Sequence, residues 1–318
     1  MPTSFGVVIV GDEILSGKRA DKHLPKVIEL LTARGLQLAY ADYVGDDPAR
    51  ITAVLARAFA AARDSGDVVF SCGGIGATPD DHTRQCAAAA LGVELGLHPE
   101  AERLIRERMQ DIAKEQGVAY EPDRDDNIHR LNMGVFPAGA DIIPNPYNKI
   151  PGFSYFAEPR TVVQDSEGKQ GPRDWLRQTA GAAAPIAEKG GSDTPKAHAV
   201  GERGGLHFVP GFPVMAWPMI EWVLDTHYGH LHQKSAYTEK SVIVMGSMEA
   251  VLTPLMLAIE AGHRGVKVFS LPSVDHPEYG RHIELGVKGA PDAVNAAFPA
   301  LLAGLHSFNA KLGPELVR

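Results

Sequence analysis

The sequence predicts an α/β protein that is built on a mostly parallel β-sheet and is followed by a small α+β domain. Short apolar runs typical of buried strands alternate with amphipathic helical segments over residues 1–90. A second alternation begins after Lys234. A chain of 318 residues is long enough for about two domains, and we expect one at residues 1–232 and the other at 235–318.

The amino-terminal part predicts strands that are joined by helices. Strands are expected at residues 5–10, 36–44 and 68–72. The first of them is an unbroken apolar run, which is typical of a sheet covered on both faces. The first helix is indicated by apolar residues at helical spacing, namely Leu24, Val27, Ile28 and Leu31. The second begins with Asp47 as N-cap and Pro48 in the first helical position. Because helices connect the strands, the strands should be parallel.

The rest of the chain gives further elements and one unusual segment. Thr78-Pro79-Asp80-Asp81 has the form of a capping box and predicts a helix from there to Leu91. Other helices are expected after Pro99 and at residues 126–134, 213–228, 248–261 and 291–305. Other strands are expected at 141–143, 206–209, 241–245, 266–271 and 281–287. Residues 159–205 are dominated by Gly, Ala, Pro, Lys and Ser, and predict a surface insertion.

Composition and charge indicate which partners and which cellular compartment to expect. Lys and Arg number 31 against 39 Asp and Glu, which gives a net charge of −8 and disfavours nucleic acid as a partner. Only Cys72 and Cys86 occur, as expected for a reduced cytoplasmic protein without a disulfide framework. No signal peptide and no apolar stretch of membrane length are visible. We expect a cytoplasmic protein that binds neither nucleic acid nor membrane.

A glycine-rich stretch is the most informative motif. Gly73, Gly74 and Gly76 follow the third predicted strand and precede Thr78 and a helix. Glycines there let backbone N–H groups approach a phosphate closely, and a helix N-terminus favours an anion. The alternative is a tight turn with a well-capped helix and no ligand.

Acidic pairs follow all three predicted strands, and they indicate a cation site. The pairs are Asp12-Glu13, Asp46-Asp47 and Asp80-Asp81. Ligands bind beyond the carboxyl ends of the strands in parallel α/β sheets, so these carboxylates are expected to converge. Mg²⁺ prefers one or two carboxylates together with phosphate and water. We therefore expect Asp46, Asp80 and Asp81 to hold a divalent metal such as Mg²⁺, the alternative being caps and solvated side chains.

A loop at residues 144–152 offers further ligand contacts. Its prolines restrict the backbone, and Asn145 and Lys149 could donate hydrogen bonds to a phosphate or a base. The alternative is an ordinary rigid turn.

Three of these motifs together resemble the molybdopterin-binding (MoaB/MogA-like) domain in the form found at the amino terminus of CinA proteins. They are Gly11 to Gly17, Val44 to Asp47, and Gly73 to Thr83. Asn145 to Gly152 and Leu206 to Pro213 fall where that family has an Asn-Pro loop and a Pro-Gly-x-Pro turn, the latter contributing Pro210 and Gly211. The resemblance extends from residue 4 to about 230, and the tail resembles the small domain that follows in CinA proteins.

The resemblance implies a three-layer α/β/α fold and a pocket for a phosphorylated pterin or nucleotide. It implies catalytic roles for Asp81 and Asp46. From its place after the first predicted strand, we also expect Asp12 to contact the phosphorylated ligand. CinA-like domains are associated with metal-dependent hydrolysis of the pyrophosphate in ADP-ribose, and a related domain of some FAD synthases with FAD hydrolysis. CinA proteins usually carry a carboxy-terminal amidohydrolase (deamidase) domain, which we expect to be absent because this chain ends at Arg318. Family members often have Ser-Glu-Met where this chain has Val214-Met215-Ala216.

These observations leave three functions open. The first is a metal-dependent nucleotide pyrophosphatase, a hydrolase acting on a dinucleotide such as ADP-ribose. The second is molybdopterin binding or adenylyl transfer in molybdenum cofactor biosynthesis. The third is a non-catalytic nucleotide-binding module, favoured by the altered residues 214–216. In each case the partner is a small phosphorylated ligand, and the resemblance favours a homo-oligomer.

Overall fold

The computed structural model describes residues 3–157, 204–232 and 238–318. The chain divides into two compact units, one made of Met1–Val27 and Leu38–His230 and the other of Leu231–Arg318 with Ile28–Gln37. Apart from its last two glycines, the surface insertion predicted at residues 159–205 lies outside the described residues. None of the helices in the described ranges is long and apolar enough to cross a membrane.

A six-stranded sheet forms the centre of the first unit, in the order β2-β1-β3-β8-β7-β6. Its strands are β1 (Phe5–Val10), β2 (Leu38–Val44), β3 (Val68–Cys72), β6 (Asp141–Ile143), β7 (Gly152–Phe156) and β8 (Gly205–Val209). Strands β2, β1, β3 and β8 run parallel, whereas β7 is antiparallel to β8 and β6 to β7. The mostly parallel α/β sheet is confirmed. Strand β7 was not predicted from the sequence.

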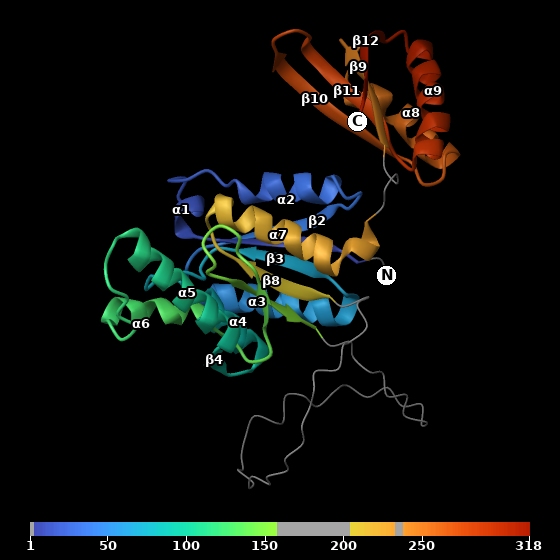
Figure 1. Cartoon of the computed structure of the whole chain (residues 1–318). Helices are drawn as coiled ribbons and strands as arrows, with labels where there is room; N and C mark the ends of the chain where they lie inside the picture. The colour runs from blue at the N-terminus through green and yellow to red at the C-terminus, as the bar shows by residue number, and fades with distance from the viewer. Residues whose placement is uncertain (1–2, 158–203, 233–237) are drawn as a thin grey trace, which may run out of the picture. The chain divides into compact units, whose positions relative to one another are not determined.

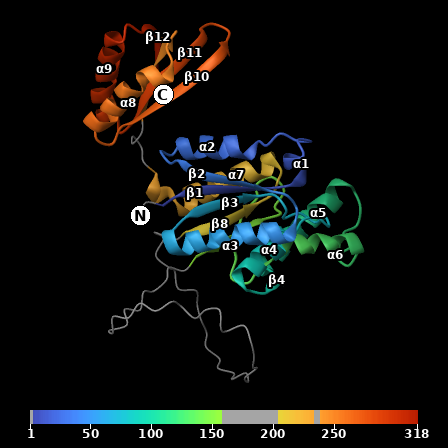
Figure 2. The ribbon, with the colours of Figure 1, turned by 180° about the vertical axis from the view of Figure 1, so that it is seen from behind.

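Helices cover both faces of this sheet and complete three layers (Figures 1 and 2). Helix α7 (Pro213–His227) and the first turns of α2 (His23–Thr32) lie on one face, and α3 (Pro48–Ser65) and α4 (Thr83–Leu91) lie on the other. Helix α3 begins as predicted, because the Asp47 carboxylate accepts a hydrogen bond from the Arg50 N–H at 2.8 Å. Phe59, Phe153 and Phe208 lie in one apolar cluster with the aliphatic residues of β1 and α3.

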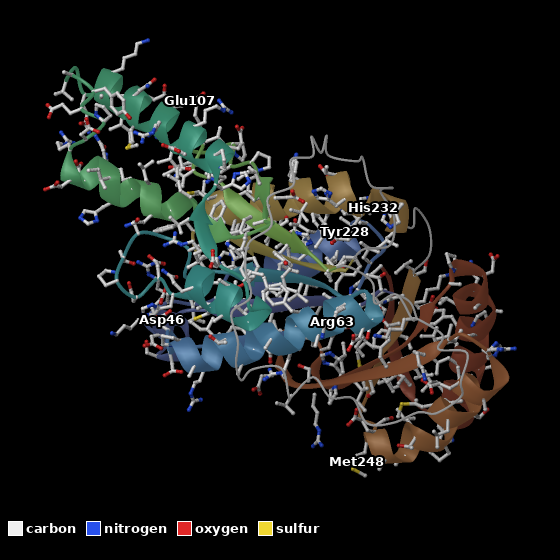
Figure 3. All side chains as sticks on the ribbon, turned by 90° about the horizontal axis from the view of Figure 1, so that it is seen from below. Asp46, Arg63, Glu107, Tyr228, His232 and Met248 are labelled. Atoms are coloured by element: carbon white, nitrogen blue, oxygen red, sulfur yellow. The ribbon has the colours of Figure 1, made fainter. Side chains whose placement is uncertain are left out.

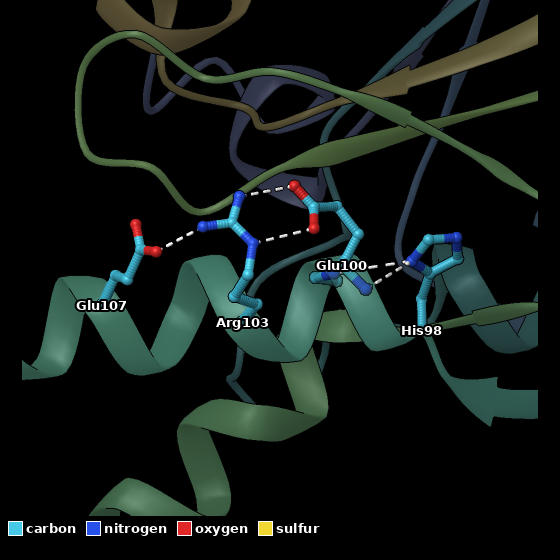
Figure 4. A network of polar contacts seen from close by, with 5 residues as sticks. His98, Glu100, Arg103 and Glu107 are labelled. Atoms are coloured by element: carbon cyan, nitrogen blue, oxygen red, sulfur yellow. Dashed lines mark hydrogen bonds and ion pairs between the residues drawn. The ribbon is translucent and has the colours of Figure 1, made fainter.

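Short elements and one exposed helix extend from the layers. The short elements are α1 (Asp12–Leu15), β4 (Leu95–Leu97), α6 (Asp125–Leu131) and β5 (Val135–Pro137). Helix α5 (Pro99–Glu115) is capped by His98, whose Nδ1 accepts from the N–H groups of Glu100 and Ala101 at 3.2 and 3.4 Å (Figure 4). Arg103 bridges Glu100 and Glu107 along its exposed face. Water screens such exposed pairs, so the buried Ile105 and Met109 stabilise this helix more.

The start of α4 corrects the predicted capping box. The helix begins at Thr83, not at Thr78, and residues 78–82 form a turn before it. Two contacts pull the chain back over the helix start: the Thr83 N–H donates to the Gly74 carbonyl at 2.9 Å, and the Thr83 hydroxyl donates to the Gly73 carbonyl at 3.1 Å. The glycine-rich stretch therefore folds onto the first turn of α4 and does not lead directly into it.

A buried hydrogen-bonded chain lies in the core between β7, β8 and the end of α7. His207 Nδ1 lies 2.8 Å from the Ser154 hydroxyl, and His207 Nε2 lies 2.8 Å from the Tyr228 hydroxyl. Both ring nitrogens are therefore engaged while the imidazole is fully buried. Burial, with a smaller effect of His227, lowers the pKa of His207 to about 3. The imidazole thus stays neutral in the folded protein.

This neutral imidazole predicts a pH dependence of stability. The unfolded state binds a proton at His207 below its ordinary pKa of 6.5, whereas the folded state does not until about 3. The contribution of His207 to the free energy of unfolding is thus fully present above pH 6.5. It falls by about 1.4 kcal/mol per pH unit as the pH drops below that value. We expect chemical denaturation of His207→Gln to show a shallower slope between pH 6 and 4. His129→Gln, on the exposed surface of α6, should keep the wild-type slope, and equal slopes in all three proteins would contradict this account.

The second unit is a small α+β domain, with a four-stranded antiparallel sheet in the order β10-β11-β9-β12. Its elements are β9 (Thr238–Met245), α8 (Glu249–Gly262), β10 (Lys267–His276), β11 (Gly280–Gly289), α9 (Pro291–Ser307) and β12 (Lys311–Val317). The sequence did not predict β12. Pro314 interrupts its pattern, which is tolerated because β12 is an edge strand with a register shift between Leu312 and Glu315.

Candidate functional site

A pocket of about 710 Å³ lies where the parallel strands end. Strands β1, β2, β3 and β8 run in one direction, so the loops that follow them emerge at one edge of the sheet. In Figure 3, Asp46 marks this edge at the start of α3, and Arg63 lies near the other end of that helix. Residues that line the pocket include Gly11, Glu13, Lys18, Arg19, Asp46, Gly73–Thr78, Asp80, Asp81, Met133, Asn145, Asn148, Ile150, Pro210, Gly211, Phe212 and Met215.

The loop after β3 presents unused backbone donors to this pocket. Within the described part of the chain, the N–H groups of Gly74, Ile75, Gly76 and Ala77 donate to no protein acceptor. Gly73 and Gly74 adopt φ values of 107° and 68°, which side chains other than glycine rarely adopt. A row of free N–H groups with glycine at the turn is suited to bind a phosphate.

Arg84 fixes this loop from inside the protein. Its Nη1 donates to the Ile75 carbonyl at 2.7 Å, and the residue is only 4% exposed. Burial lowers the pKa of Arg84, and the negative charge of Asp81 opposes that effect. Holding the Ile75 carbonyl on the protein side helps to keep the neighbouring N–H groups available to the pocket. The guanidinium also adds positive potential beneath the glycine-rich loop.

Asp81 and Thr78 bind each other across the turn before α4. The Asp81 Oδ2 accepts hydrogen bonds from the Thr78 N–H at 2.8 Å and from the Thr78 hydroxyl. Both residues line the pocket. Because one carboxylate oxygen of Asp81 is already engaged, Asp81 shapes the loop in addition to facing the pocket.

Asp46 and Asp12 form a reciprocal contact between the loops that follow β2 and β1. The Asp12 N–H donates to the Asp46 carboxylate at 2.9 Å, and the Asp46 N–H donates to the Asp12 carboxylate at 3.2 Å. Partial burial raises the pKa of Asp46, and the negative charges of Asp12, Glu13 and Asp80 raise it further. The same acids line an open depression of about 620 Å³ beside the pocket. Asp12 lines this depression, whereas Asp46 and Asp80 line both hollows.

The donor set fits a divalent cation only in part. Among the described residues, no three His, Cys, Asp or Glu side chains form a group that could hold a metal ion. Asp46 and Asp80 nevertheless line one pocket, and the pKa of Asp46 is raised first by burial and then by the negative charges of the neighbouring carboxylates. Mg²⁺ commonly takes one or two carboxylates and completes its shell with phosphate and water. The residues therefore fit a cation that arrives with a phosphorylated ligand.

The loop between β6 and β7 is held together by its own amides. Asn145 donates from Nδ2 to Asn148 Oδ1 at 2.8 Å and to the Ile150 carbonyl at 2.9 Å, and its Oδ1 accepts from the Tyr147 N–H at 3.0 Å. Asn145 lines the pocket, but its side-chain amide is already hydrogen-bonded to residues of its own loop. Lys149 does not line the pocket, and its ammonium pairs with Asp111 at 2.6 Å.

Pro210 and Gly211 form one side of the pocket, next to an apolar wall. His23, which is 5% exposed, binds the Gly211 carbonyl through Nε2 at 3.0 Å and so fixes this turn. Phe212 and Met215 follow, and with Met133 they give the pocket its apolar part. Such a wall is suited to contact the flat ring of a base or a pterin.

A family model described as a probable molybdopterin binding domain matches residues 6–230. The chain belongs to this family. The membership confirms the resemblance that the three loop motifs predicted. The matched residues include β1, β2, β3 and β8 and all the loops that line the pocket.

This molybdopterin-binding domain is similar to CinA-like proteins. It is 33% identical over 148 residues to a CinA-like protein of Anaeromyxobacter dehalogenans, covering 46% of this chain and 33% of that protein. It is 34% identical over 160 residues to a CinA-like protein of Mycobacterium marinum, covering 50% of this chain and 36% of that protein. The match thus spans roughly a third of the length of these two relatives.

Two solved structures are similar to the molybdopterin-binding domain. CinA of Thermoplasma acidophilum, described as a protein of unknown function, has a TM-score of 0.45 and 21% identity over 70% of this chain and 98% of that one. The molybdopterin biosynthesis enzyme MoaB of Thermus thermophilus has a TM-score of 0.35 and 16% identity over 72% of this chain and 96% of that one. Assignment to the family depends on the sequence match over residues 6–230.

The structure of this molybdopterin-binding domain adds residues that the sequence did not single out. Lys18 and Arg19 line the pocket, Arg84 braces the glycine loop, and His23 holds the Gly211 turn. Lys18 and Arg19 could have been noticed as a basic pair that follows an acidic loop after a strand. Arg84 and His23 carry no such local signal, because their partners are 9 and 188 residues away.

Proposed function

We propose that the pocket binds a phosphorylated nucleotide and hydrolyses the phosphoanhydride bond of a dinucleotide such as ADP-ribose, with a divalent cation. One observation carries this proposal. The row of free N–H groups at Gly74–Ala77 opens into the same pocket as the crowded carboxylates around Asp46. Donors for phosphate oxygens and oxygen ligands for a cation thus share one pocket, which is the combination that phosphoryl chemistry needs.

Each group has a defined role in this proposal. The N–H groups of Gly74–Ala77 donate to one phosphate and orient it. Asp46 and Asp80 are the residues that would hold the cation. When bound, the cation neutralises charge on the phosphates and lowers the pKa of a water molecule. The carboxylate of Asp81 keeps the turn closed through Thr78, and the wall formed by Phe212 and Met215 contacts the base.

A substrate screen tests this proposal. The purified chain is incubated with ADP-ribose, FAD and NAD, with and without Mg²⁺ or Mn²⁺, and the products are separated by chromatography. We expect release of a nucleoside monophosphate that requires the cation and disappears with EDTA. Binding of the dinucleotides without any cleavage would leave only a non-catalytic binding module, and neither binding nor cleavage would reject the proposal.

A second candidate is favoured by the matched family model, whose description names molybdopterin. A pterin with a phosphate could use the same N–H row, and its ring could contact Met133 and Met215. Fluorescence titration with molybdopterin, followed by incubation with ATP, separates pterin binding from adenylyl transfer. Pterin affinity well above that for ADP-ribose would favour this candidate over the pyrophosphatase.

A further inference from the structure

Lys18 and Arg19 form a second group of hydrogen-bond donors in the pocket, apart from the N–H row. They are the only basic side chains among the described residues that line it, against the acids Glu13, Asp46, Asp80 and Asp81. Their loop follows β1, whereas the N–H row follows β3, and β1 and β3 are paired neighbours in the sheet. The pocket therefore has two donors of different kind at adjacent strand ends.

Neither Lys18 nor Arg19 engages its charged group with another described residue. Within the described residues, Lys18 and Arg19 have no ion-pair or hydrogen-bond partner for their side chains, although acids line the same pocket. By contrast, the nearby Lys149 pairs with Asp111, and Arg84 binds the Ile75 carbonyl. Their backbone is nevertheless fixed, because the Arg19 N–H donates to the Glu13 carbonyl at 3.0 Å and Gly17 turns the chain with a φ of 73°. Two free cations on an anchored loop are placed to meet an anion that enters the pocket.

We propose that Lys18 and Arg19 are a second anion subsite, which makes the pocket select ligands with two linked phosphates over ligands with one. This inference rests on the proposed function and specifies its ligand class. Both groups line one pocket and lie in loops that follow two paired strands, so one ligand with two linked phosphoryl groups can contact both. A monophosphate occupies the N–H row alone. A diphosphate also reaches the cations, which offset part of the repulsion from the four acids.

The affinities of two ligands for the wild type, a double variant and a control variant test the subsite. AMP and α,β-methylene-ADP differ by one phosphoryl group, and the methylene bridge prevents hydrolysis. Both are titrated by calorimetry in EDTA, so that no cation contributes. The test variant is Lys18→Gln/Arg19→Gln. The matched control is Lys22→Gln, an exposed lysine of the same segment that does not line the pocket.

We expect the double variant to bind α,β-methylene-ADP at least about tenfold more weakly, because charge-assisted hydrogen bonds are lost. Its affinity for AMP should change less than about threefold, and its loss of diphosphate affinity should be largest at low salt. Lys22→Gln should match the wild type with both ligands. Thermal unfolding should be unchanged, since both mutated side chains are exposed.

Two results would overturn the subsite, and a third would reject the proposed function as well. Equal losses for AMP and the ADP analogue would mean a general electrostatic effect. No loss for either ligand would mean that the cations do not contact the phosphates. If the wild-type chain binds neither ligand in EDTA and neither in a repeat titration with Mg²⁺, the proposed function fails together with the subsite.

Discussion

Replacing Gly73 with alanine is expected to abolish nucleotide binding and to lower the free energy of unfolding by about 3 kcal/mol or more. A Cβ at Gly73 would overlap the backbone carbonyl oxygen of Val10, which belongs to β1 and cannot move without breaking the sheet. The φ of 107° at this position adds strain for any residue with a side chain. The loop must shift to relieve both effects, and its free N–H groups then lose their alignment.

Gly66→Ala is the matched control for this change. Gly66 also has a positive φ, 75°, but a Cβ there would meet nothing within 4 Å. It should cost about 1 kcal/mol through backbone strain alone and leave nucleotide affinity unchanged. Chemical denaturation and calorimetric titration of both variants check the comparison. If Gly73→Ala keeps wild-type affinity, the N–H row is not the phosphate site.

Asp46→Asn is expected to reduce cation-dependent cleavage of ADP-ribose by at least about 100-fold. The amide oxygen can still accept from the Asp12 N–H, so the contact between the two loops survives, but the charge that we propose to hold the cation is lost. Because Asp12, Glu13 and Asp80 crowd this carboxylate, its removal should also raise the melting temperature of the ligand-free protein slightly. Activity and stability should therefore move in opposite directions, which mere misfolding would not produce.

The pH dependence gives an independent check of Asp46. Only the ionised carboxylate binds a cation, and the pKa of Asp46 is raised. As pH falls, cation affinity should therefore weaken at a higher pH than for an ordinary aspartate. Asp47→Asn is the matched control, since Asp47 does not line the pocket and Asn caps a helix equally well. Equal cleavage by Asp46→Asn and Asp47→Asn would remove Asp46 from the cation site.

Much of the first unit could be predicted because its signals are local. The unbroken apolar run of β1, the capping pair Asp47-Pro48 and the glycines after β3 each depend on residues close in sequence. Parallel strands then bring the motif residues to one edge of the sheet, and all but Asp12 and Lys149 of the predicted site residues line the pocket.

The errors arose where distant contacts override a local pattern. The capping box at Thr78 has the right residues, but the bonds from Thr83 and Arg84 back to the glycine loop move the helix start five residues on. Strand β12 carries a proline and a register shift, which weaken its alternation, and its pairing with β9 places it in the sheet.

By itself, the sequence determined the layered α/β fold, the family and the chemical types that meet at the strand ends. The tertiary structure alone decided which of those groups remain available to a ligand. Asn145 and Lys149 have donors in the sequence, but these donors are taken by Ile150 and Asp111. The side-chain donors of Lys18 and Arg19 have no partner among the described residues and line the pocket. The reason is physical: a donor is free only if no acceptor lies within about 3 Å, and most such acceptors belong to residues that are distant in sequence.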